Sequence, residues 1–177
     1  MKSTASSIPA LLLLMALPGQ LFARQQRGED PTALPQTQSD DYTRYELQAP
    51  GSGAFRIFYD VTATTPGKLH YFNTIRAGAE EEVHGVTDLM TGQPLAWEVV
   101  SGEVAQRNGH PRASPEGRYI QVTLARPVPE GGEVRIRVDK TYWDHESYYL
   151  EGDEIVFDRS LGIKRNAVVL PAGYEVI

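Results

Sequence analysis

Apolar and polar residues alternate one by one along several stretches of this chain, and no other feature restricts its fold as strongly. In the segment EVRIRVD, the apolar residues Val134, Ile136 and Val138 are separated by arginines. The segments AFRIFYDVT and RYIQVTLA, at 54–62 and 118–125, show the same period of two. This is the pattern of a β-strand with one face against a core and the other in water, as found in antiparallel sheets.

Turns rich in Gly and Pro separate the alternating stretches, as in LMTGQP and RPVPEGGE. We therefore expect an all-β fold, an antiparallel β-sandwich of about 9–11 short strands, with no substantial helix outside the N-terminal segment. Trp97, in register with Leu95 and Val99, is predicted to be core, and the segment 164–170, apolar on both faces, to be a central strand. The expected strands are 43–49, 54–64, 68–76, 82–89, 95–101, 118–125, 132–141, 147–151, 154–158 and 164–170, with a further one beginning at 174.

The N-terminus has the pattern of a secretory signal peptide. Lys2 precedes an apolar run, IPALLLLMALPGQLFA, which is short for a membrane span and ends in Leu21-Phe22-Ala23, an imperfect small-residue cleavage signal. We predict a signal peptide over 1–23, cleaved near Ala23, with an uncleaved membrane anchor as the alternative. Residues 24–42 are polar and contain proline, so we expect a flexible linker there. The sandwich domain should span 43–177, and we expect the native protein to continue past Ile177.

Composition limits where the protein is found and what it binds. The chain has no cysteine and no Asn-x-Ser/Thr acceptor site, so a bacterial periplasm or the cell exterior is the simplest location. The formal net charge of −6 argues against nucleic acid and anionic lipid as partners. After cleavage we expect no membrane contact. The partner would be a protein or a glycan, and the oligomeric state stays open.

Catalytic motifs are missing from the sequence. It has no His-Glu-x-x-His, no Gly-rich phosphate loop and no cysteine nucleophile, and none of its four histidines lies two or four residues from another. The segment DRSLG at 158–162 lacks the first glycine of a nucleophile elbow, so Ser160 is interpreted as a turn hydroxyl. We predict no catalytic residue, no metal and no cofactor, and we favour a protein that is not an enzyme while leaving that question open.

The segment KTYWDHESYYLEG gathers aromatic residues after the clearest strand. If Val134, Ile136 and Val138 face inward, Trp143 falls on the opposite, outer face. An outward Trp beside tyrosines forms a stacking platform for a sugar or a peptide. We favour the alternative, in which a second sheet buries Trp143 or Trp143 covers a sheet edge, because Trp is usually highly buried. The candidate ligand-binding residues are Tyr142, Trp143, Tyr148 and Tyr149.

Two longer segments resemble a known family. LARPVPEGGEVRIRVDKTY is a Pro-rich turn leading into a strand that ends in an aromatic residue, and RNAVVLPAGYEV is a strand followed by Leu-Pro-x-Gly-Tyr. Together they resemble the N-terminal β-domain of the gluzincin aminopeptidases, and related uncharacterised secreted bacterial β-sandwich proteins. The resemblance covers roughly 43–177 and implies a saddle-like sandwich that precedes a zinc domain. No catalytic residue carries over, because the metal and most catalytic groups of that family lie in the next domain.

Three functions remain in order of preference. The first is a non-catalytic secreted or periplasmic β-sandwich domain that acts as a structural or interaction module. The second is a carbohydrate- or peptide-binding module that uses the aromatic residues named above. The third is the N-terminal domain of a zinc aminopeptidase-like protein.

Overall fold

A computed structural model describes residues 30–177, so the predicted signal peptide at 1–23 and the first part of the predicted linker lie outside the described residues. The described chain is all-β, as the alternation predicted, with ten strands and one six-residue helix. The strands are β1 Gln38–Leu47, β2 Ala54–Ala63, β3 His70–Ile75, β4 Glu80–Asp88, β5 Trp97–Ser101, β6 Arg118–Thr123, β7 Val134–Trp143, β8 Tyr148–Glu151, β9 Glu154–Phe157 and β10 Arg165–Val169, and the helix is α1 Gly102–Arg107.

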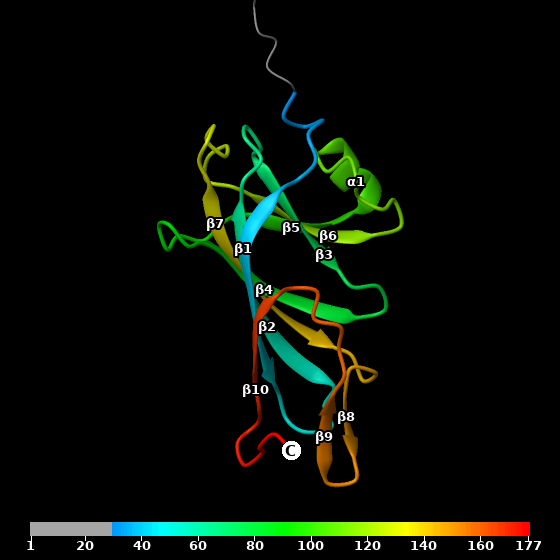
Figure 1. Ribbon diagram of the computed structural model, residues 1–177. Coiled ribbons are helices and arrows are strands. Elements are labelled where there is room, and N and C mark those ends of the chain that lie inside the picture. The colour runs from blue at the N-terminus through cyan, green and yellow to red at the C-terminus, as the bar shows by residue number, and fades with distance from the viewer. Residues whose placement is uncertain (1–29) are drawn as a thin grey trace, which may run out of the picture.

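The strands form two packed sheets and a separate hairpin (Figure 1). The larger sheet has five strands in the order β10-β1-β2-β7-β4, and the smaller has three in the order β3-β6-β5. Strands β8 and β9 pair only with each other. Every pairing is antiparallel except that of β1 with β10, which is parallel.

The core lies between the two sheets. Ile57 on β2 and Ile136 on β7 point inward from the larger sheet, and Ile120 and Val122 on β6 point inward from the smaller one. All four are at most 4% exposed, and they belong to one continuous cluster. Burying these side chains is the main stabilising contribution available to a chain without disulfides.

The domain starts earlier than predicted. Strand β1 begins at Gln38, so it includes residues 38–42 of the predicted linker. Residues 38, 39 and 42 pair with β2, residue 42 also pairs with β10, and residues 40 and 41 lie in the bulge of β1. Before the strand, the side chain of Gln36 bonds both backbone groups of Phe72, at 3.0 and 2.8 Å. Polar side chains that bond the backbone hold this segment to the smaller sheet, and a composition rule for disorder does not detect such contacts.

Three further predictions are corrected. Residues 174–177 form no strand, because no neighbouring strand pairs with them. Strand β10 lies at the sheet edge and is not central, which leaves Val168 and Val169 exposed. Trp97 is not plain core: it faces the same side as Val122 but is 38% exposed, because β5 is the edge of the smaller sheet.

The short helix α1 was not predicted. Ser101 caps its N-terminus by accepting a hydrogen bond from the backbone N–H of Val104, and Glu103 lies in its first turn. Within the helix, Ala105 is fully buried. Six residues make less than two turns, which is too short for a 3.6-residue period to be recognised in the sequence.

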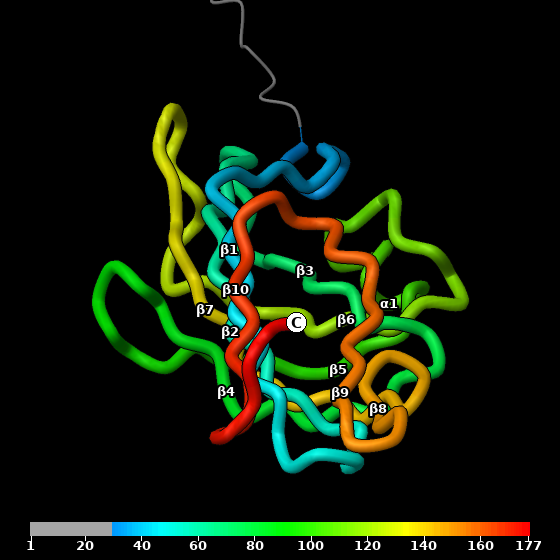
Figure 2. Tube along the Cα trace, turned by 60° about the horizontal axis from the view of Figure 1, so that its bottom comes forward, coloured from blue at the N-terminus to red at the C-terminus, as the bar shows by residue number. Residues whose placement is uncertain are grey.

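The connection between β9 and β10 crosses from the hairpin to the far edge of the larger sheet (Figure 2). Its residues Arg159, Ser160, Gly162 and Ile163 line a cavity between the sheets. This connection therefore supplies one wall of the candidate site.

Candidate functional site

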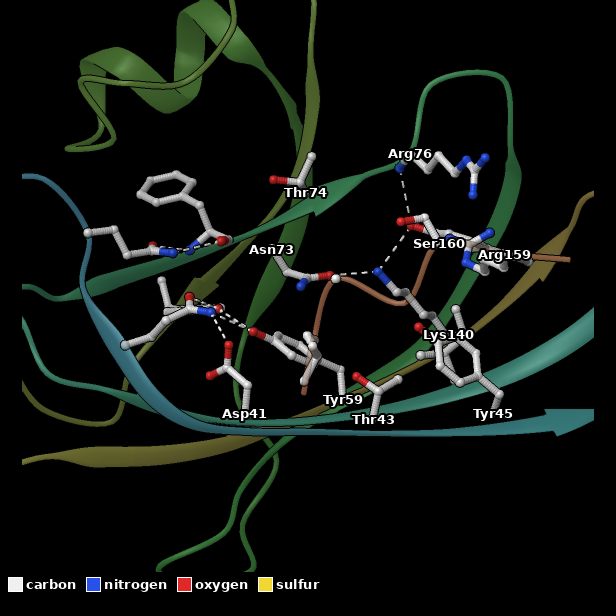
Figure 3. A pocket seen from close by; sticks show the side chains of 18 of the residues that line it. Asp41, Thr43, Tyr45, Tyr59, Asn73, Thr74, Arg76, Lys140, Arg159 and Ser160 are labelled. Carbon is white, nitrogen blue, oxygen red and sulfur yellow. Dashed lines mark hydrogen bonds between the residues drawn. The ribbon is translucent and has the colours of Figure 1, made fainter. Parts of the chain in front are cut away.

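A cavity of about 710 Å³ opens between the inner faces of the two sheets. Strands β1, β2 and β7 form one side, β3 forms the other, and the β9–β10 connection closes part of the rim (Figure 3). Protein interiors rarely leave a void larger than a water molecule, and ligand sites have volumes of roughly 300–1,000 Å³. We call this space the inter-sheet cavity.

A lysine amine projects into this cavity from the floor. Lys140 is the inward residue that follows Val138 along β7, and it is only 4% exposed. Its Nζ donates to Oδ1 of Asn73 at 2.6 Å and to the hydroxyl of Tyr142 at 3.1 Å, and both partners are neutral. An ammonium has three donors, so one remains for a ligand.

Burial changes the charge behaviour of this amine. Loss of hydration, helped by the nearby charge of Arg159, lowers the pKa of Lys140 to about 7, and the carboxylate of Glu81 offsets only part of that. Glu81 is itself ion-paired with Arg118. At neutral pH the cavity therefore holds an amine that is half protonated and lacks a carboxylate partner of its own.

Two arginines add positive charge to the same end. The guanidinium of Arg159 lies 5.1 Å from the ring centre of Phe55 and 5.4 Å from that of Tyr142, so it stacks against the aromatic wall. Its one carboxylate partner among residues 30–177 is Asp144, at 3.4 Å. Arg76 also lines the cavity, and its backbone N–H donates to the Tyr142 hydroxyl. Lys140, Arg76 and Arg159 make this the cationic end of the cavity.

The opposite end carries acceptors without partners. The register of β1 against β2 shifts between Ser39 and Tyr42, and Asp40 adopts a φ of 52°, which is unusual for a residue other than glycine. After this bulge, Asp41 and Thr43 both line the cavity. Asp41 Oδ1 and Thr43 Oγ1 are buried and have no hydrogen-bond partner within the described part of the chain. Buried polar atoms are rarely left unpaired, so each one needs an explanation.

Tyrosine hydroxyls fill the space between the two ends. Gln38 accepts from the Tyr71 hydroxyl at 2.7 Å and donates to the Tyr59 hydroxyl at 2.8 Å and to Asp41 at 2.5 Å. Burial raises the pKa of Tyr59 to about 12, and burial likewise raises the pKa of Tyr71 and of Tyr142. These hydroxyls stay protonated at neutral pH and keep the capacity to donate.

The structure separates the four predicted ligand-binding residues. Tyr142 and Tyr148 are buried, at 2% and 0% exposure, and Trp143 and Tyr149 are half-buried. The register of β7 against β2 is unbroken, so Trp143 does lie on the outer face as its phase predicted. Tyr148 donates to the backbone oxygen of Gln48 at 2.9 Å. The four rings therefore do not form one exposed platform, and only Tyr142 lines the inter-sheet cavity.

The residues that sequence reasoning missed are Lys140, Arg159, Asp41 and Thr43. The alternation that assigned Trp143 to the outer face also assigns Lys140 and Tyr142 to the inner one, so a lysine at an inward position was a usable signal. The bulge that sets Asp41 was not readable, because nothing in the local sequence fixes the position of the extra residues.

Serine chemistry and metal chemistry each need a group of side chains that the described cavity does not bring together. Ser160 lines the cavity near Lys140 in Figure 3, but no hydrogen bond joins the two in the described structure, and a serine nucleophile needs such a bond to its base. Among residues 30–177, no three or more His, Asp or Glu side chains gather as they would around a metal ion. The expectation of no metal and no catalytic residue stays a prediction.

Comparisons with known proteins concern the fold. No family model and no curated protein matches the chain. A solved M1 zinc metallopeptidase from Deinococcus radiodurans aligns with 60% of this chain and 20% of its own, at 14% identity and a TM-score of 0.44. A two-domain M1 zinc metallopeptidase mutant bound to L-tryptophan aligns with 67% of this chain and 22% of its own, at 15% identity and a TM-score of 0.44.

Both solved structures are zinc metallopeptidases, and the sequence motifs resemble the N-terminal β-domain of zinc aminopeptidases. The chain spans about a fifth of the length of these solved structures. Identities and TM-scores at this level transfer no residue role and no activity. Within residues 30–177, every helix is too short or too polar to cross a membrane.

Proposed function

We propose that this protein is an exported, non-catalytic interaction module that binds a small polar ligand in the inter-sheet cavity. A saccharide or a short peptide fits the mixture of aromatic rings, hydroxyls and charged groups that lines it. This combines the interaction role expected from the sequence with the expected ligand classes, and moves the site from the surface aromatics to the cavity.

One observation carries the proposal: the cavity wall contains buried polar groups that the described protein does not pair. Thr43 is 2% exposed, yet its hydroxyl has no partner, and the same is true of one oxygen of Asp41. At the other end of the same wall, one of the three donors of the Lys140 amine has no partner among residues 30–177. Leaving such groups unpaired is costly, so a ligand that supplies partners gains binding free energy.

Ligand-observed NMR with a panel of neutral saccharides, acidic saccharides and short peptides tests this proposal. Ser160 is exposed at the rim, so Ser160→Trp should block the cavity with little effect on folding. Thr91→Trp, at the exposed tip of the β4–β5 turn, is the control. Signals that Ser160→Trp removes and Thr91→Trp keeps would support the proposal. Signals that persist in Ser160→Trp, or a panel with no binder, would reject it.

Export is a separate part of the proposal. It rests on Lys2 and the apolar run that ends near Ala23. We place the mature protein in the periplasm or outside the cell. Mass spectrometry of the protein secreted by a bacterial host should find Arg24 as the first residue. An N-terminus that still carries the apolar run would favour the membrane-anchored alternative.

The N-terminal domain of a longer zinc aminopeptidase-like protein is the second candidate. The motifs RPVPEGGEVRIRV and VVLPAGYEV favour it. The test is the DNA after the Ile177 codon: a continuing frame that encodes His-Glu-x-x-His would support this candidate, and a stop codon would end it.

A further inference from the structure

The cationic end of the inter-sheet cavity has the charge and the hydrogen-bond donors that bind an anion. Among residues 30–177, Lys140 has one donor without a partner, and Arg159 has a single weak ion pair at 3.4 Å for its five donors. A carboxylate accepts from an ammonium and a guanidinium at once, and such charge-assisted bonds are about twice as strong as neutral ones. The rings of Tyr142 and Phe55 behind Arg159 exclude water from this end.

The end of the cavity with Asp41 and Thr43 can bind the hydroxyl groups of a ligand. Asp41 Oδ1 accepts only, and Thr43 Oγ1 both donates and accepts. A ligand with neighbouring hydroxyls satisfies both atoms, and the buried tyrosine hydroxyls between the ends offer further partners. Tyrosine and phenylalanine side chains are among those that line the cavity, and their rings offer apolar surface to a sugar.

The register gives the span between the two ends. Ile57 pairs with both Lys140 and Tyr45, so Lys140 lies level with Tyr45, two strand spacings or about 10 Å away. Thr43 lies two residues further along β1, about 7 Å of strand, and Asp41 lies beyond it in the bulge, at most about 13 Å along the strand. A single sugar ring does not reach from one end to the other, whereas two linked rings do.

We propose that the ligand is an acidic saccharide, whose carboxylate lies between Lys140 and Arg159 and whose hydroxyls bond Asp41 and Thr43. This inference rests on the proposed function and narrows its ligand class. It assigns a role to Lys140 and Arg159, the two cavity cations whose hydrogen-bond donors the described residues do not all pair.

Isothermal titration calorimetry of the full chain at pH 6, with four probes, tests the inference. α-1,4-Linked digalacturonate is the acid, and galactobiose is its neutral counterpart. Trialanine tests a peptide, and inorganic phosphate tests charge alone. We expect digalacturonate to bind at least about tenfold more tightly than any of the other three, because one of its two carboxylates gains charge-assisted bonds that they cannot combine with ring contacts.

Two lysine variants test whether Lys140 is the residue that recognises the negative charge of the ligand. Lys140→Met should remove the preference for digalacturonate over galactobiose. Lys68→Met is the matched control, because Lys68 is also buried but its Nζ donates to the backbone oxygen of Gly109, and neither of these two residues lines the cavity. It should leave both affinities within about twofold.

The pH dependence of the unmodified protein is a second readout, which does not depend on the folding of a variant. Burial holds the pKa of Lys140 near 7, so its positive charge is lost above neutral pH. The affinity for digalacturonate should fall by about tenfold from pH 6 to pH 8, while that for galactobiose stays constant.

The failures are distinguishable. Equal affinities for galactobiose and digalacturonate would overturn the acidic ligand while the cavity remains a binding site. If trialanine bound more tightly than digalacturonate, the ligand would not be a saccharide. If phosphate bound as tightly as digalacturonate, the cavity would recognise negative charge alone. If no probe binds at all, the inference and the proposed function both fall.

Discussion

Asn73 on β3 and Lys140 on β7 connect the two sheets across the inter-sheet cavity, with Nζ of the lysine donating to Oδ1 of the amide at 2.6 Å. Around this bond the sandwich has a cavity where it would otherwise have apolar contacts. A buried ammonium held by neutral groups destabilises the fold relative to an apolar residue of the same size. The buried Lys140 amine is therefore better suited to ligand binding than to the stability of the fold.

Replacing Lys140 should change how stability depends on pH. The pKa of Lys140 is about 7 in the folded protein and 10.5 as its reference value, so between these the unfolded state holds more protons. Its contribution to the free energy of unfolding therefore rises with pH, by at most about 1.4 kcal/mol per unit. Below pH 7 both states are protonated and the destabilisation is fully present.

Urea unfolding of the wild type and of Lys140→Met from pH 6 to 9.5 measures this effect. The range stops below the tyrosines, whose raised pKa values would lower stability again at higher pH. We expect the wild type to gain about 2–3 kcal/mol relative to the variant between pH 7 and 9.5. Parallel pH profiles for the two proteins would show that Lys140 is not buried as described.

Gly102 should tolerate no side chain. A Cβ at this position would overlap the backbone oxygen of Ser114, which cannot move as a side chain would. Overpacking of this kind costs about 1–3 kcal/mol or more, so we expect Gly102→Ala to lower the free energy of unfolding by about 2 kcal/mol or more. The control is Gly85→Ala on β4, where a Cβ meets no atom within 4 Å. Its effect in chemical denaturation should stay within about 1 kcal/mol.

Two valines that face the same side of the smaller sheet should differ in their contribution. Val122 on β6 is 0% exposed, and Val99 on the edge strand β5 is 40% exposed. Val122→Ala should cost about 2–3 kcal/mol through lost transfer free energy and a residual cavity. Val99→Ala should cost about 0.5 kcal/mol or less. Equal losses in thermal or urea unfolding would mean that β5 is covered after all.

On the outer face of the larger sheet, Arg137 and Asp60 pair through two hydrogen bonds of 2.6 and 2.7 Å. Their side chains are 42% and 20% exposed, so water and salt screen the pair. A double-mutant cycle with Arg137→Met and Asp60→Asn should give a coupling of about 0.5–1 kcal/mol that shrinks in 1 M salt. A coupling that salt leaves unchanged would argue for a buried pair.

The fold was largely readable from the sequence, because alternation in segments such as EVRIRVD fixes which residues face the core. What could not be read was exposure at the sheet edges. Trp97 faces the side of the sheet that the alternation predicted. Its exposure depends on the order of the strands, which is set by pairing between segments that are far apart in the chain. The parallel pairing of β10 with β1 is likewise a tertiary contact without a local signal.

The candidate site was only partly predictable. Tyr142 was identified, although for a surface platform and not for a cavity. Lys140 follows from continuing the alternation of β7. The direction of Asp41 depends on a bulge, and the position of Arg159 depends on a connection that crosses between the sheet edges. Both are set by how the two sheets pack, which local residue preferences do not determine.

The most direct measurement is the NMR titration of the Lys140 side chain with and without digalacturonate. The chain has only four lysines, so their labelled ε-carbons are resolvable, and the Lys140→Met spectrum assigns the signal. We predict a midpoint at about pH 7 for the free protein, and a clearly higher midpoint when the acid is bound. A midpoint near that of an exposed lysine, unchanged by the acid, would contradict both the buried amine and its role in binding.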